Sequence, residues 1–165
     1  MKTFIKILKW AGIAIVVAGG FWYWNAHNKP FVARDFDEVA AELKDPKKIE
    51  RYAKQLEEAY KKDFDGGDTP EETLNLFIAA LKVGNTDLAA KYFLLEEQEK
   101  QRKELQVGKE KGNIDFFLSF LMKAENRSGN EDERAIMTVV ENGKAVMSIE
   151  FVRNPYTKKW KIESL

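Results

Sequence analysis

The amino-acid sequence predicts an α+β protein in which an N-terminal transmembrane helix is followed by helices packed on a curved antiparallel sheet meander. Three observations lead to this prediction. Residues 10–24 contain no charged side chain. Residues 36–122 repeat apolar side chains at helical spacing, whereas residues 134–165 alternate them with a period of two. A run of helices followed by a run of strands is typical of α+β domains.

The uncharged stretch, WAGIAIVVAGGFWYW, is predicted to be a membrane anchor. As a helix its residues rise about 22 Å, and a wider span over residues 4–24 rises about 31 Å, which matches the roughly 30 Å of a bilayer core. Lysines precede the stretch and bias that end towards the cytoplasm, and their long side chains can reach the near headgroups. The residues expected at the membrane interfaces are Lys6, Lys9, Trp10, Trp22, Tyr23 and Trp24.

Two other interpretations of this stretch stay open. A cleaved signal peptide also has a basic start, a short apolar core and a small residue at the cut, here Ala18 before Gly19. Apolar and aromatic residues continue beyond Ala18, which favours the uncleaved anchor. A buried soluble helix would explain neither the preceding lysines nor the clustered tryptophans. The chain has no cysteine, so anchoring through a lipid-modified cysteine is excluded.

The anchor divides the chain into predicted segments with different charge. Residues 1–29 hold four lysines and no acid, whereas the remainder holds 23 basic and 27 acidic residues and has a net charge near −4. The chain after residue 29 is mildly acidic, and its basic and acidic side chains are interspersed. It therefore lacks the basic patch of a nucleic-acid binder, and we expect no nucleic-acid partner. The predicted segments are a cytoplasmic start (1–9), the anchor (10–24, or 4–24 at its widest), a linker (25–34), membrane-proximal helices (35–64) and an α+β domain (68–165).

The membrane-proximal segment is predicted to form two amphipathic helices. Asp45-Pro46 ends the first helix and starts the second, with Asp45 as N-cap and Pro46 at the first helical position. We expect this pair to pack on its own domain, and the alternatives are a stalk or a helix that pairs with a partner protein. The apolar side chains of the first helix are Phe36, Val39, Ala40 and Leu43, and those of the second are Ile49, Tyr52, Ala53, Leu56 and Tyr60.

A strong helix start opens the following domain. In Thr69-Pro70-Glu71-Glu72 the threonine hydroxyl can accept a hydrogen bond from the Glu72 amide, and the Glu72 side chain can accept one from a backbone amide at the start of the helix. Pro70 lies at the first helical position, where a backbone N–H would have no partner within the helix. This helix is predicted to end at Gly84. A short helix capped by Thr86 or Asp87 is expected to follow.

Two further helices of different character are predicted. Residues 96–105 are nearly all polar and predict an exposed helix. Gly108 to Gly112 is predicted to be a flexible break. Residues 114–122 are apolar on almost all sides, so we expect this helix to be buried on most sides.

The strands follow from a change to period two. Asn142-Gly143 is a two-residue hairpin signal between residues 134–141 and 144–152, and it pairs Glu141 with Lys144. The face of this hairpin that points away from the predicted core is also rather apolar, and we expect a neighbour to cover part of it. In the last strand, residues 159–165, Trp160 is expected opposite Phe151 and Ile162 opposite Ile149. The predicted core face of the hairpin comprises Ile136, Thr138, Val140, Ala145, Met147, Ile149 and Phe151.

The domain resembles a known family. The string DTPEETLNLFIAALKVGNTDLAAKYF, then an apolar helix, then a meander ending in KKWKI, is similar to small membrane-tethered NTF2-like domains of bacteria, including an uncharacterised group that opens with a "TPEE" helix. The resemblance covers residues 68–165 and implies a cone, with helices on the concave face of a sheet and a cavity between them. Three strands are predicted where such domains often have four or more, so a reduced variant is the alternative. The matching residues are Thr69, Pro70, Glu71, Phe77, Gly84, Asp87, Ala89, Ala90, Phe93, Trp160 and Ile162.

Residue types for catalysis are few in this sequence. His27, in the linker, is its sole histidine, and there is no cysteine, so zinc, Cys/His and Ser/His sites are excluded. We therefore predict no catalytic, metal-binding or cofactor-binding residue and no cofactor. If the implied cone holds a cavity, its candidate lining residues are Tyr92, Asp115, Phe117 and Trp160, although Asp115 also fits a first-turn carboxylate that stabilises its helix.

Three hypotheses for function follow. The first is a non-catalytic single-pass protein of the cell membrane, with a cytoplasmic N-terminus and an NTF2-like binding domain outside the cytoplasm. Its partners would be the lipid bilayer and a protein partner or a second copy, with a small ligand as the alternative. The second is a structural subunit of an envelope or secretion assembly, by analogy of layout. The third is an enzyme that uses a carboxylate in the cone.

Overall fold

The computed structural model describes residues 31–126 and 133–165. The predicted anchor, its interface residues and His27 lie outside the described residues. The chain divides into two compact units, Met1–Phe31 and Val32–Leu165, and the second unit is described below. Among its described helices, none combines the length and apolar character that crossing a bilayer would require.

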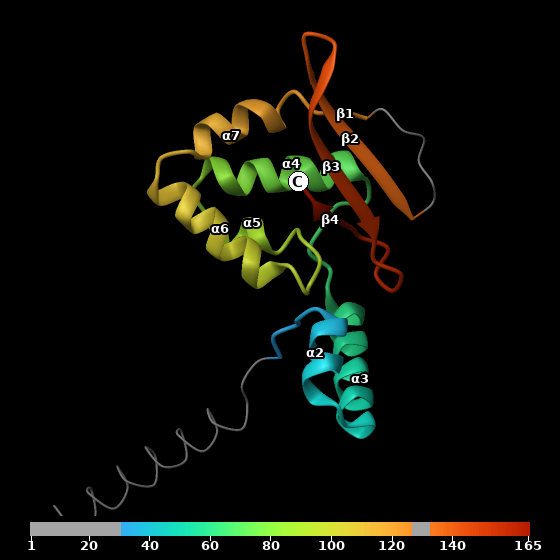
Figure 1. The fold of residues 1–165 in the computed structure, drawn as a ribbon. Helices are drawn as coiled ribbons and strands as arrows, with labels where there is room; N and C mark the ends of the chain where they lie inside the picture. The colour runs from blue at the N-terminus through green and yellow to red at the C-terminus, as the bar shows by residue number, and fades with distance from the viewer. Residues whose placement is uncertain (1–30, 127–132) are drawn as a thin grey trace, which may run out of the picture. The chain divides into compact units, whose positions relative to one another are not determined.

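The described residues form an α+β fold, as predicted, with six helices followed by an antiparallel meander (Figure 1). The helices are α2 (Phe36–Leu43), α3 (Pro46–Lys62), α4 (Pro70–Lys82), α5 (Thr86–Ala90), α6 (Gln98–Glu110) and α7 (Ile114–Leu121). The strands are β1 (Glu125–Asn126), β2 (Arg134–Glu141), β3 (Lys144–Arg153) and β4 (Trp160–Ser164), in the sheet order β1-β2-β3-β4. The three long strands were predicted, and the two-residue edge strand β1 was not, because two residues show no periodicity.

Side-chain caps start α3 and α4 at the residues that the sequence predicts. Asp45 accepts the amide of Lys47, and Thr69 accepts the amide of Glu72. The Glu72 carboxylate reaches back to the amide of Asp68 at 2.6 Å. The predicted cap of α5 is wrong, because Asn85 is the N-cap and accepts the amide of Leu88.

Helix α6 is longer than predicted. The expected break at Gly108 is wrong, because the helix continues through this glycine to Glu110. The turn comes at Gly112, whose φ of +71° suits a residue without a Cβ. Leu105 is buried against the domain core, so packing of its apolar side sustains a helix that is polar elsewhere.

Helix α7 is far more exposed than predicted. Only Leu118 and Leu121 of this helix are buried, whereas Phe116 is 70% exposed. The helix packs along α4 with one side, and its opposite side carries apolar residues that no other described element covers. The expectation of burial on most sides is therefore wrong.

A β-bulge decides which face of β2 enters the core. The predicted pairing of Glu141 with Lys144 is confirmed, and Asn142 and Gly143 both have positive φ, as the tight turn requires. The register then shifts between Val139 and Val140. Because a shift of one residue exchanges the two faces of a strand, the predicted core face is wrong for β2. In β3 it is right for Ile149 and Phe151 and wrong for Ala145, which is exposed. The buried residues of β2 are Ala135, Met137 and Val139.

Strand β4 is also displaced from its predicted register. Phe151 lies opposite Ile162, and Arg153 lies opposite Trp160, so the predicted Phe151–Trp160 and Ile149–Ile162 pairs are wrong. The displacement is by two residues, which keeps Trp160 and Ile162 on the core face. On its other edge β4 bonds residues 92–94, since Ile162 N donates to Tyr92 O at 2.8 Å and Leu94 N donates to Ile162 O at 3.0 Å.

Helix α4 crosses the covered face of the sheet and carries the centre of the core (Figure 1). Phe77 of α4 is fully buried and meets the rings of Phe93 and Phe117 edge-on, at centroid distances of 5.4 and 6.3 Å. Side chains from α4, α5, α6, α7 and the three long strands thus form one continuous core.

Candidate functional site

The four candidate cavity residues lie in different surroundings. Tyr92 and Trp160 are buried in the core between the helices and the sheet. Asp115 is exposed in the first turn of α7. Phe117 is half-buried and lines a pocket of about 280 Å³ between α6 and α7. The pocket has an apolar floor, to which Leu105 also contributes, and a rim that includes Glu104.

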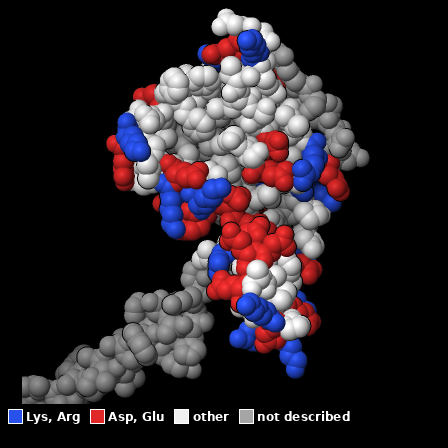
Figure 2. All heavy atoms as spheres, in the orientation of Figure 1, with Lys and Arg blue, Asp and Glu red and all other residues white. Residues whose placement is uncertain are grey.

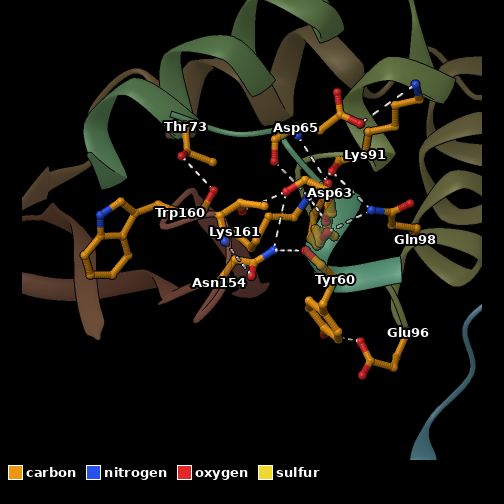
Figure 3. Close-up of polar contacts among 12 residues, drawn as sticks. Tyr60, Asp63, Asp65, Thr73, Lys91, Glu96, Gln98, Asn154, Trp160 and Lys161 are labelled. Atoms are coloured by element: carbon orange, nitrogen blue, oxygen red, sulfur yellow. Dashed lines mark hydrogen bonds and ion pairs between the residues drawn. The ribbon is translucent and has the colours of Figure 1, made fainter. Parts of the chain in front are cut away.

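A buried ion pair that sequence reasoning missed joins β4 to the end of α3 (Figure 3). The Lys161 side chain is completely buried, and its Nζ lies 2.8 Å from Oδ2 of Asp63. The same ammonium group donates to the backbone carbonyls of Asp65 at 2.9 Å and Lys91 at 2.6 Å. The ammonium group therefore has one carboxylate and two carbonyl oxygens around it.

Burial dominates the electrostatics of this pair. It raises the pKa of Asp63 and lowers the pKa of Lys161, since both charged forms lose contact with water, and each charge partly offsets the shift of the other. A second carboxylate oxygen of Asp63 accepts the amide of Asp65 at 3.2 Å. Removing either partner would leave the other charge buried without an opposite charge, and this would destabilise the fold.

The hairpin between β3 and β4 holds the same end of α3. Asn154 is buried, and its Nδ2 donates to Tyr60 O at 2.9 Å and to Asp63 O at 3.4 Å. Its Oδ1 accepts the amides of Tyr156 and Thr157 at 3.0 and 3.3 Å. The Thr157 hydroxyl adds a bond of 2.8 Å to Asp63 O. A hairpin some 90 residues away in sequence therefore satisfies carbonyls at the C-terminus of α3.

The opposite side of α3 is held by the turn before α6. The Tyr60 hydroxyl donates to the Glu96 carboxylate, and burial together with this carboxylate raises the pKa of Tyr60. Gly66 lets the loop between α3 and α4 approach β4 closely. A Cβ on Gly66 would lie 2.3 Å from the carbonyl oxygen of Trp160, so only glycine fits there. This contact was not visible in the sequence.

The chemistry of this cluster is structural. The Lys161 side chain is completely buried, so its ammonium group cannot reach a substrate as a base or nucleophile. Among residues 31–126 and 133–165, no three His, Cys, Asp or Glu side chains are placed to bind a metal ion. The cluster instead locks α3 to the α+β domain.

Replacing Asn154 with alanine is expected to lower the free energy of unfolding by about 2–3 kcal/mol, because two turn amides lose their acceptor and the carbonyls of Tyr60 and Asp63 each lose one of their donors. Equilibrium denaturation would measure this loss. Hydrogen exchange of the last turn of α3 should also accelerate. Asn75→Ala, at an exposed position of α4, is the matched control and should change stability by less than about 0.5 kcal/mol. Equal effects of the two substitutions would contradict the role of Asn154 in holding the end of α3.

The second unusual feature is the side of α7 that no other described element covers. Phe116 is 70% exposed and Met122 is 58% exposed. On the face of the domain seen in Figure 2, the surface over α7 and α4 carries fewer charged side chains than the surfaces over α3, α5, α6 and the ends of the sheet. Large exposed apolar side chains grouped on one helix are typical of a binding surface.

Comparison with protein-family models, curated proteins and solved structures finds no match to this chain. The resemblance of residues 68–165 to NTF2-like domains therefore depends on its sequence features alone. Function is argued below from the contacts and surfaces of the chain itself.

Proposed function

We propose that this chain is a non-catalytic, single-pass membrane protein. Its N-terminus lies in the cytoplasm, and residues 68–165 form a reduced NTF2-like domain on the other side of the membrane. That domain acts as an interaction module. The antiparallel meander with helices on one face is compatible with an NTF2-like cone, and the lysine-flanked apolar segment supports the membrane location.

The single observation that carries the interaction role is the apolar side of α7. Phe116 and Met122 are exposed on a helix whose other side is packed in the core. Large apolar side chains exposed on the same side of one helix can form a contact surface for a partner. The polar groups around Asp63 and Lys161 bind one another, which supports a structural role in holding α3 rather than a catalytic role.

Membrane location is tested with the full chain produced in a bacterium. We expect it to stay in the membrane fraction after alkaline carbonate extraction and to begin at its own N-terminus when sequenced. A phosphatase fused after Leu165 should be active, because this enzyme matures only outside the cytoplasm.

A matched pair of substitutions sharpens the test. Val16→Arg places a charge in the middle of the predicted span and should release the chain, because insertion of arginine there costs about 2.5–3.5 kcal/mol. Val16→Leu should not. Mature protein beginning at Gly19, or wild-type chain in the carbonate supernatant, would refute the anchor.

A further inference from the structure

We propose that the pocket between α6 and α7 binds a small organic cation, in which an apolar ring system carries a short chain that ends in a primary amine. The pocket has a volume of about 280 Å³. This inference goes beyond the proposed interaction role. It depends neither on the exposed side of α7 nor on the membrane anchor.

Helix α6 forms one wall of the pocket with a single side. Gln101, Glu104, Leu105 and Gly108 line the pocket, and their positions i, i+3, i+4 and i+7 lie on one side of a helix. Leu105 is buried in the core and contributes to the floor, whereas Gln101 is half-buried and Glu104 is exposed. The wall therefore changes from apolar to polar towards solvent, which suits a ligand with an apolar body and a polar end.

The opposite wall comes from the start of α7. Ile114 and Phe117 line the pocket, and both are half-buried. The Phe117 ring also meets the ring of Phe77 edge-on at 6.3 Å, and this contact with the core holds it in place. The apolar part of the pocket thus combines an aromatic ring with the aliphatic side chains of Ile114 and Leu105. The ring of a ligand would lose contact with water there, which favours binding.

The turn between the two helices places polar groups at the pocket. Gly112 has a φ of +71°, and the Asn113 amide donates to the Gly108 carbonyl at 2.9 Å, as in a Schellman motif. Asn113 is the N-cap residue of α7, but its side chain makes no capping bond. Gln101 makes no side-chain hydrogen bond to a described residue. Both side-chain amides are therefore available to a ligand.

Gly108 keeps space in the pocket open. Its φ does not lie in the left-handed region, so the backbone does not require glycine. A Cβ on Gly108 would lie 3.6 Å from Cδ1 of Ile114, which is an ordinary contact, so packing does not require glycine either. Glycine inside a helix is less favourable than alanine. Helix α6 thus carries a destabilising residue at the point where a methyl group would enter the pocket, and this indicates that the space is used.

The charge of the pocket lining selects a cation. Glu104 is charged, and none of the described side chains that line the pocket is basic. The other two glutamates of α6, Glu99 and Glu110, contact side chains of their own helix. Glu104 has no hydrogen bond or ion pair to a described residue. A carboxylate left without a partner above an apolar floor is complementary to an ammonium group.

A primary amine fits this lining in both its donors and its size. An ammonium group has three N–H donors, and Gln101, Glu104 and Asn113 each have a side-chain oxygen that can accept a hydrogen bond. A ligand with a carboxylate would instead meet Glu104 with like charge. A cavity of about 150 Å³ accommodates benzene, so a pocket of about 280 Å³ suits one or two fused rings with a short chain.

Tryptamine is the probe for this site, and tryptophol and indole-3-propionate are its neutral and anionic counterparts. The three share an indole ring and a two-carbon chain, and they differ in the group that ends the chain. Titration calorimetry with the full chain in mild detergent should give a dissociation constant of about 0.1–1 mM for tryptamine, since so small a ligand makes few contacts. Tryptophol should bind about three- to tenfold more weakly, and indole-3-propionate more weakly still.

A matched pair of glutamate substitutions tests the ion pair. Glu104→Gln should weaken the binding of tryptamine about three- to tenfold and leave that of tryptophol unchanged. Glu110→Gln makes the same change of charge on α6 outside the pocket lining, so it should leave both unchanged. This comparison also corrects for uptake of the indoles by detergent. Binding of tryptamine to Glu104→Gln within about twofold of wild type would overturn the proposal.

Gly108→Ala tests whether the space is used. This variant should melt at a higher temperature, because alanine favours helix, and should bind tryptamine at least about threefold more weakly, because the methyl group enters the pocket. Misfolding cannot produce both changes together. Val107→Ala, at a residue that is 46% exposed and does not line the pocket, should bind as wild type does. Unchanged binding by Gly108→Ala, or equal binding of the three indoles, would refute the site whatever the location of the chain.

Discussion

Replacing Lys161 with methionine is expected to lower the free energy of unfolding by about 3–5 kcal/mol. The substitution removes the ammonium group that lies 2.8 Å from Asp63 and leaves that carboxylate buried without an opposite charge. It also removes the donor to the carbonyls of Asp65 and Lys91. Equilibrium unfolding in urea, monitored by circular dichroism, measures the loss.

Lys159→Met is the matched control for this prediction. Lys159 lies two residues earlier and forms an ion pair of 2.7 Å with Asp68, whose side chain is largely exposed. Exposed ion pairs contribute little, so this substitution should cost less than about 1 kcal/mol. A similar loss for both lysines would contradict the importance of burial.

The penalty for Lys161→Met should also depend on pH. Burial already raises the pKa of Asp63, and removing the lysine removes a contact that opposes this shift. A carboxyl whose pKa is higher in the folded than in the unfolded state favours folding when it is protonated, and this contribution is lost as the pH rises through the folded pKa. The variant should therefore recover stability relative to wild type as the pH is lowered from neutrality.

A double variant separates the pair from its parts. Asp63→Asn together with Lys161→Met removes both charges, so no uncompensated charge stays buried. The double variant should lose less stability than the sum of the two single losses, although the backbone carbonyls still lack their donor. Additive losses would show that the two charges do not act as a unit.

Replacing Phe77 with alanine is expected to cost about 3–5 kcal/mol, comparable with the loss at Lys161. Phe77 is fully buried at the centre of the core, where its ring meets those of Phe93 and Phe117. The substitution leaves a cavity between α4 and α7 that the surrounding rings cannot fill completely. Denaturant unfolding gives the free energy, and hydrogen exchange should show faster opening of α7 than of α3.

The neighbouring residue provides the control. Leu76 lies on the same helix, is partly exposed and is absent from the buried core. Leu76→Ala should cost less than about 1 kcal/mol, because little buried volume is removed and alanine favours helix. If Phe77→Ala were no more destabilising than Leu76→Ala, the core would not be centred on α4.

The sequence by itself determined the elements and their caps. Asp45, Thr69 and Asn142-Gly143 act through bonds and backbone angles within a few residues, so their effects are visible in any short window. The order of helices followed by strands likewise follows from local periodicity. The alternation of apolar residues in β2 could not by itself reveal which side of the strand enters the core, because the register shift between Val139 and Val140 depends on pairing with β3.

Tertiary structure decided the two features on which function is argued. Lys161 looks like a surface lysine in sequence, and it is buried because Asp63 and two carbonyls from distant segments converge on its ammonium group. The α7 segment looks like a buried helix, and Phe116 is exposed because the elements that the structure describes pack against the other side of α7. Whether a side chain is buried depends on segments far along the chain, and local pattern carries no information about where those segments lie.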